Sequence, residues 1–122
     1  MTPSDVRLLI HAASLSNREA ADALAIGDDS IIRKWKRGDE TPSDERAAKL
    51  IGFAADALSE QLIRALELAA DGRVEIARLT VNPDTIALEG IERFSAVTAL
   101  ALRAAFIARL MQRGLKIERD DQ

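Results

Sequence analysis

The chain has 122 residues, a formal net charge of −3 and 48% hydrophobic residues, enough for one folded domain or a small head with a dimerisation element. Aromatic residues make up only 3%, so Ala, Leu, Ile and Val must fill the core, and this composition favours helices. The absence of cysteine excludes a disulfide framework, a thiolate metal site and a cysteine nucleophile.

Nothing in the sequence suggests a membrane or an exported protein. The start of the chain lacks a basic region followed by a long apolar run, and the most apolar stretch, residues 96–111, is interrupted by Arg103 and Arg109. We therefore expect no signal peptide and no membrane span. A cytoplasmic location is the expectation, which also agrees with the lack of cysteine.

The first helix is predicted over residues 3–13. Each of the three prolines follows a residue that can cap a helix, in the pairs Thr2–Pro3, Thr41–Pro42 and Asn82–Pro83. Such a pair is typical of a helix start, because proline lacks the N–H that would be unpaired in the first turn. Helices are therefore predicted to begin at residues 3 and 42, and a short one after Pro83.

Two short helices are predicted between the first two prolines. Ser16 and Glu19 have the spacing of a capping box and predict the start of the second helix. The third begins at Asp28 or Asp29 and ends at Gly38, a residue suited to the left-handed conformation just past a helix end. Its expected buried anchors are Ile32 and Trp35.

The remainder is predicted as a long helix followed by a mixed region. Apolar residues keep helical spacing from 42 to about 70, with a possible break at Gly52 or Ser59. Alternating patterns predict strands within residues 74–81 and 115–119, on either side of a helix over 95–113. The predicted fold class is mainly α, with an N-terminal helix-turn-helix domain of four to five helices and a small α+β (strand-helix-strand) dimerisation part.

Residues 15–43 resemble the helix-turn-helix of Cro/CI-type regulators from phages and bacteria, the XRE-like family. The resemblance covers residues 3 to about 58, and its matching positions are Leu15, Ser16, Asn17, Glu19, Ala21, Leu24, Ile26, Ile32, Trp35, Arg37, Gly38, Pro42 and Ser43. It implies a DNA-binding domain over 1–58, a connecting helix over 59–72 and a dimerisation region over 73–122. The size and layout also resemble those of anti-CRISPR-associated repressors of phages.

The sequence departs from the family pattern in the turn and after the tryptophan. The family has glycine directly after the leucine that ends the second helix, whereas this chain has Ala25 there and Gly27 two positions later. The distance from Ile26 to Trp35 is one residue longer than usual, which predicts a longer turn. Lys36 replaces the family's glutamate, and this removes an acid and adds a candidate phosphate contact.

The third helix carries the candidate DNA contacts. If Ile32 and Trp35 are buried, the outer face can reach base edges in the major groove, which makes Asp29, Ser30, Arg33 and Lys34 the candidate base-reading residues. The resemblance implies phosphate contacts at Asn17, Arg18, Lys36 and Arg37. The alternatives are a helix cap at Asp28, Asp29 or Ser30, and an ordinary solvated basic turn over residues 33–37.

The helix over 95–113 is apolar on most sides, more than a short tail can cover, and this predicts a homodimer interface. Its expected interface residues are Val97, Leu100, Phe106, Ile107 and Leu110. A symmetric dimer would read an inverted repeat in double-stranded DNA. We therefore expect a sequence-specific repressor, acting on its own promoter.

Other classes of function fit less well. An antitoxin or adaptor that binds another protein through the apolar C-terminal helix is the main alternative. RNA binding ranks last because no aromatic cluster is visible. We expect no catalysis, cofactor or small-molecule ligand, because there is no phosphate-binding glycine loop or nucleophile motif. We also expect no metal site around His11, the only histidine.

Overall fold

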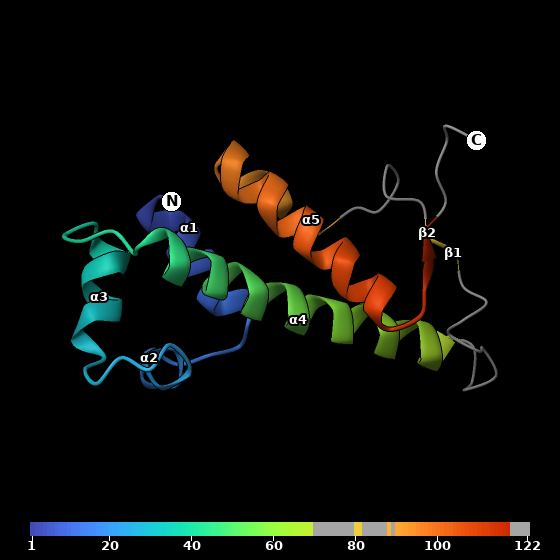
Figure 1. Cartoon of the computed structure of the whole chain (residues 1–122), viewed down its shortest axis with the longest axis horizontal. Coiled ribbons are helices and arrows are strands. Elements are labelled where there is room, and N and C mark those ends of the chain that lie inside the picture. The colour runs from blue at the N-terminus through green and yellow to red at the C-terminus, as the bar shows by residue number, and fades with distance from the viewer. Residues whose placement is uncertain (70–79, 82–87, 89, 118–122) are drawn as a thin grey trace.

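The computed structural model describes residues 1–69, 80–81, 88 and 90–117 (Figure 1). In chain order the elements are α1 (Pro3–Ala12), α2 (Asn17–Ala23), α3 (Ser30–Arg37), α4 (Asp44–Ala69), β1 (Thr80–Val81), the 3₁₀ turn η2 (Ile91–Arg93), α5 (Ala96–Gln112) and β2 (Lys116–Ile117). Figure 1 shows α4 along the long axis of the molecule, α5 beside it, and α2 and α3 at one end. None of the helices in these ranges is long and apolar enough to cross a membrane.

Local signals set the ends of the first three helices. Thr2 and Asp5 form a capping box at the start of α1, and Ser16 and Glu19 form the predicted one at the start of α2. Each box satisfies backbone N–H groups that have no partner within the helix. Gly38 ends α3 with φ 86°, which confirms its predicted left-handed conformation. A Cβ at this position would also lie 3.0 Å from Pro3 Cγ, so only glycine fits without a shift of α1.

The long helix α4 is continuous through both positions where a break was considered. Ser59 is buried, and its hydroxyl donates to the carbonyl of Asp56 within the helix. Gly52 lies under the side chain of Arg109, whose Nη2 would be 3.2 Å from an added Cβ. The residue therefore allows α5 to approach closely. The predicted domain boundary at residue 58 consequently falls inside α4.

One hydrophobic core joins the N-terminal helices to α5. The inner face of α5 contributes Leu102, Phe106 and Leu110, all at most 2% exposed. These side chains belong to the same buried cluster as Leu9 of α1 and Trp35 of α3. Because burial of apolar area is the main stabilising term in folding, the head and the C-terminal helix stabilise one another.

The predicted α+β part is wrong. The described residues are helical, and no sheet forms a layer against α5. The only strand pairing among them is a two-residue parallel contact of Thr80 with Lys116 and Val81 with Ile117. Short alternating stretches do not distinguish a strand from an extended connection. In addition, the apolar face of α5 is covered by the helix α4 and not by a sheet. The strand expected at residues 74–76 and the helix expected after Pro83 lie outside the described residues.

A buried carboxylate links the start of α1 to the start of α5. Asp5 is completely buried and accepts hydrogen bonds from the Thr2 N–H at 3.1 Å, the Ser95 N–H at 2.8 Å and the Thr98 hydroxyl at 2.9 Å. The Ser95 hydroxyl donates to the same carboxylate. Burial alone would raise the pKa of Asp5, but the hydrogen bonds from Ser95, Thr2 and Thr98 lower it to about 2.

This carboxylate should make folding sensitive to acid. The pKa of Asp5 falls from 3.8 to about 2 on folding, so its contribution is present above pH 3.8 and is lost as the pH falls toward 2. We expect a loss of about 2 kcal/mol in the free energy of unfolding across that window. Urea unfolding at pH values from 6 to 2 measures it, and Asp5→Asn should flatten this part of the curve.

The control is Asp22→Asn, which removes an exposed carboxylate paired with Arg18. It should change stability by less than about 0.5 kcal/mol, because exposed ion pairs contribute little. An Asp5→Asn protein with the same pH profile as the unmodified protein would show that Asp5 does not link the two helices.

Candidate nucleic-acid interface

Helices α2 and α3 pack together at one end of the molecule. Ile32 and Trp35 of α3 are 0% and 2% exposed, as predicted for its anchors. On the α2 side, Ala20 and Ala21 are buried, and their small side chains allow the two helices to approach closely. The opposite face of α3 is left at the surface with its charged residues. The two buried anchors thus fix how α3 is presented to solvent.

The turn between α2 and α3 contains a left-handed alanine. Ala25 has φ 57° and follows Leu24 at the end of α2. The N–H of Ile26 donates to the carbonyl of Ala21 at 2.8 Å, which closes the end of the helix as a left-handed cap does. Ala25 therefore has the conformation for which the family pattern supplies glycine, although its Cβ makes that conformation costly. Gly27 does not have a positive φ and does not take over this role.

Replacement of Ala25 by glycine should stabilise the protein. Removing the Cβ relieves the steric strain of the left-handed conformation. The gain in stability is partly offset by the greater conformational freedom of glycine in the unfolded chain. We expect Ala25→Gly to raise the free energy of unfolding by about 0.5–1 kcal/mol, measured by urea denaturation. The control Ala23→Gly, in the exposed last turn of α2, should lower it by about 1 kcal/mol. A destabilised Ala25→Gly protein would contradict the strain assigned to this turn.

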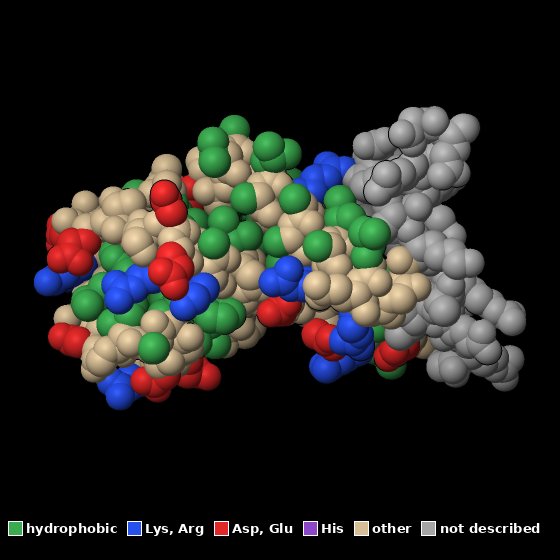
Figure 2. All heavy atoms as spheres, viewed as in Figure 1, with side chains coloured by type: hydrophobic (Ala, Val, Ile, Leu, Met, Phe, Trp, Pro, Cys, Tyr) green, Lys and Arg blue, Asp and Glu red, His purple; other side chains and the backbone are tan. Residues whose placement is uncertain are grey.

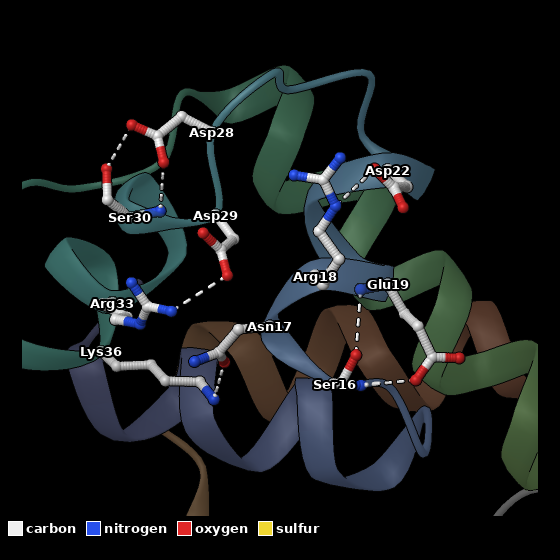
Figure 3. Close-up of polar contacts among 10 residues, drawn as sticks. All are labelled: Ser16, Asn17, Arg18, Glu19, Asp22, Asp28, Asp29, Ser30, Arg33 and Lys36. Carbon is white, nitrogen blue, oxygen red and sulfur yellow. Dashed lines mark hydrogen bonds and ion pairs between the residues drawn. The ribbon is translucent and has the colours of Figure 1, made fainter.

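The start of α3 is capped by Asp28. Its carboxylate accepts from the Ser30 N–H at 2.9 Å and from the Ser30 hydroxyl at 2.7 Å (Figure 3). These two hydrogen bonds lower the pKa of Asp28, because they favour the charged carboxylate. Asp29, which occupies the N-cap position, makes no side-chain cap bond. Of the three candidates for a capping role, Asp28 therefore performs it and Ser30 is its partner.

Asp29 instead pairs with Arg33 along the helix. The Arg33 guanidinium lies 3.0 Å from the Asp29 carboxylate, and the two side chains are 53% and 26% exposed (Figure 3). The predicted base-reading residues Asp29, Ser30 and Arg33 thus lie at the start of α3, with Lys34 next along the helix. The structure brings these side chains to one end of the molecule.

Three other basic residues of this region also face acids. Lys34 lies 3.7 Å from Glu40, Arg37 lies 3.0 Å from Asp39, and Arg18 of α2 lies 3.4 Å from Asp22. All six side chains are more than 40% exposed. Exposed pairs of this kind contribute about 0–1 kcal/mol, so they are readily exchanged for another anion. Figure 2 shows basic and acidic side chains mixed over this end of the molecule.

Lys36 and Asn17 join α3 to the start of α2. The Lys36 ammonium donates to the Asn17 side-chain oxygen (Figure 3), and the Lys36 carbonyl accepts from the Arg7 guanidinium of α1 at 2.5 Å. Partial burial lowers the pKa of Lys36, and the nearby positive charge of Arg7 lowers it further. No local signal in the sequence points to Arg7, because no local spacing relates residues 7 and 36.

The residues predicted for the dimer interface separate into two groups. Phe106 and Leu110 are 2% and 0% exposed and pack inside the chain, so α4 already covers them. Val97 and Leu100 are 81% and 73% exposed. Ile107 is half-buried between the two groups. A partner could therefore contact Val97 and Leu100 directly, but not Phe106 or Leu110.

Comparison with known proteins adds no relative: no protein-family model, curated protein or solved structure matches the chain. The resemblance to Cro/CI-type regulators therefore remains a prediction from the residues of α2 and α3. Within the described part of the chain, no group of three or more His, Asp or Glu side chains could hold a metal ion.

Proposed function

We propose that the protein is a homodimeric repressor that binds an inverted repeat in double-stranded DNA, at its own promoter. The observation that carries this proposal is the attachment of α3 to the core. Ile32 and Trp35 are buried, while Arg33 and Lys34 remain at the surface of the same helix. A helix held in this way can enter the major groove without losing its support.

The acidic net charge does not oppose DNA binding at this surface. The exposed ion pairs of Lys34 and Arg37 are individually weak, so a phosphate or a base edge can replace each carboxylate at little cost. The Arg33–Asp29 pair has a further use, because the carboxylate orients the guanidinium at the start of α3. Arginine donates to guanine O6 and N7, while aspartate accepts from the amino group of cytosine.

The outer face of α5 supports a dimer. Helical spacing places Val97, Leu100 and Met111 on the side opposite the buried Phe106, and these three side chains are 81%, 73% and 51% exposed. Ala104 lies between them and is also exposed. Figure 2 shows hydrophobic side chains gathered over α5 at the top of the view. The same face on a second copy would cover this uncharged surface and bring two α3 helices into one assembly.

The alternative function uses the same outer face of α5 for a different protein. Its exposed leucine and valine support an antitoxin or adaptor as well as a dimer. The two functions differ in the mass of the purified protein. A stable dimer in isolation favours the repressor, and a monomer that associates only with a partner favours the adaptor.

Base reading is tested by titrating the protein against its own upstream DNA and a scrambled duplex, at two salt concentrations. We expect preference for the upstream DNA and steep weakening with salt. Arg33→Ala and Lys34→Ala should each cost about 1–3 kcal/mol on the preferred sequence and relax specificity. Equal weakening on both duplexes would make the residue a phosphate contact, and no preference by the unmodified protein would end the repressor proposal.

The dimer is tested by a charge on the outer face of α5. Leu100→Glu should reduce the mass in solution from two chains to one, because two carboxylates would be buried together in a symmetric interface. The control Leu68→Glu changes a leucine of α4 that is equally exposed, at 74%, and should leave the mass unchanged. Phe106 is unsuitable for this test because a charge there would disrupt the core. A dimer unaffected by Leu100→Glu would exclude this face as the interface.

A further inference from the structure

We propose that Arg7, Lys36 and Asn17 form a site for one backbone phosphate of duplex DNA, which fixes the position of α3 in the groove. This inference rests on the proposed function and extends it to a residue of α1. The three residues come from three different helices, α1, α3 and α2. A phosphate held among them would touch every helix that supports the candidate base-reading surface.

Two hydrogen bonds already assemble this site. The Arg7 guanidinium donates to the carbonyl of Lys36 at 2.5 Å, and the Lys36 ammonium donates to the side-chain oxygen of Asn17. That arrangement uses one acceptor of Asn17 and leaves its amide N–H groups for an anion. The guanidinium of Arg7 and the ammonium of Lys36 have further N–H groups and no acceptor. The site therefore offers hydrogen-bond donors from three side chains to an anion.

The described residues do not neutralise the charge of the site. The basic residues of the surrounding surface, Arg18, Arg33, Lys34 and Arg37, each face a carboxylate. Within the described residues, neither Arg7 nor Lys36 makes such an ion pair. Burial lowers the pKa of Lys36, and repulsion by the nearby positive charge of Arg7 lowers it further. An anion between them would relieve this repulsion.

The position of the site favours a phosphate of the DNA backbone. Lys36 lies one turn after Arg33 on α3, and Figure 3 shows both side chains on the side of α3 that faces Asn17. Phosphate contacts beside a recognition helix set its orientation without reading sequence. An Arg7–Lys36–Asn17 contact would thus place Arg33 over the base edges while contributing equally on every sequence.

The experiment measures how binding to a duplex of about 20 bp depends on salt, by fluorescence anisotropy between about 50 mM and 200 mM KCl. Arg7→Gln and Lys36→Met should each reduce the slope of log K against log salt by about 1, the value for one lost phosphate contact. Each should weaken binding roughly ten-fold at 0.1 M salt, equally on the upstream and the scrambled duplex.

Arg113→Gln is the matched control, because it removes the same charge at the far end of α5, where Arg113 pairs with Glu60. Its slope should equal that of the unmodified protein. Lys36→Met retains the Lys36 carbonyl to which Arg7 donates and loses only the hydrogen bond to Asn17, so it should lower the free energy of unfolding by no more than about 1 kcal/mol. Unchanged slopes for both Arg7→Gln and Lys36→Met, with duplex binding intact, would overturn the site but not the proposed function.

A second measurement separates failure of the site from failure of DNA binding. Inorganic phosphate is titrated into the ¹⁵N-labelled full chain, and the Arg7 Nε and Asn17 amide resonances are followed by NMR. Shifts that disappear in Lys36→Met support an anion site. If the unmodified protein binds no duplex, the proposed function fails. Phosphate-dependent shifts in that case would mean that the site binds free phosphate, and its proposed role on DNA would be overturned. Absence of both shifts and duplex binding would overturn the site itself.

Discussion

The carboxylate of Asp5 is the interaction on which the arrangement of the helices depends. It accepts hydrogen bonds from the N–H groups of two residues that each precede a helix, Thr2 before α1 and Ser95 before α5. A buried carboxylate is stable only when its hydrogen-bonding capacity is filled, so Asp5 determines where α5 begins relative to α1. Within the described residues, every buried side-chain nitrogen and oxygen has a partner. The position of α5, and therefore of its exposed face, follows from this polar contact together with the apolar packing on α4.

The predictions that the structure confirms depend on residues that are close together in the sequence. Ser16 with Glu19 and the left-handed Gly38 are local features, and each fixes a helix end by itself. The same holds for Ile32 and Trp35, whose spacing of three residues places both on one face of α3. These signals depend on a few neighbouring residues, so tertiary contacts do not need to be known in advance.

Contacts between distant residues could not be predicted in this way. The local sequence marks Asp5 only as an acid in the first turn of α1, because its hydrogen bonds to Ser95 span 90 positions and cannot be inferred from local spacing. Arg7 reaches Lys36 across 29 positions for the same reason. The apolar surface of α5 was recognised, yet its division into a face covered by α4 and an outer face required the structure. The predicted α+β part was wrong because alternation over a few residues fits an extended connection equally well.

The unbroken course of α4 has a mechanical consequence for a DNA-binding dimer. Its 26 residues form a rod about 39 Å long, and both the head and α5 pack against this rod. A flexible linker would let two heads adjust to half-sites at several separations, as disordered tethers do. A rigid rod instead fixes the distance and the rotation between them. A repressor of the proposed kind would then measure the spacing of its operator as strictly as its sequence, because a half-site displaced by one base pair is also rotated around the duplex.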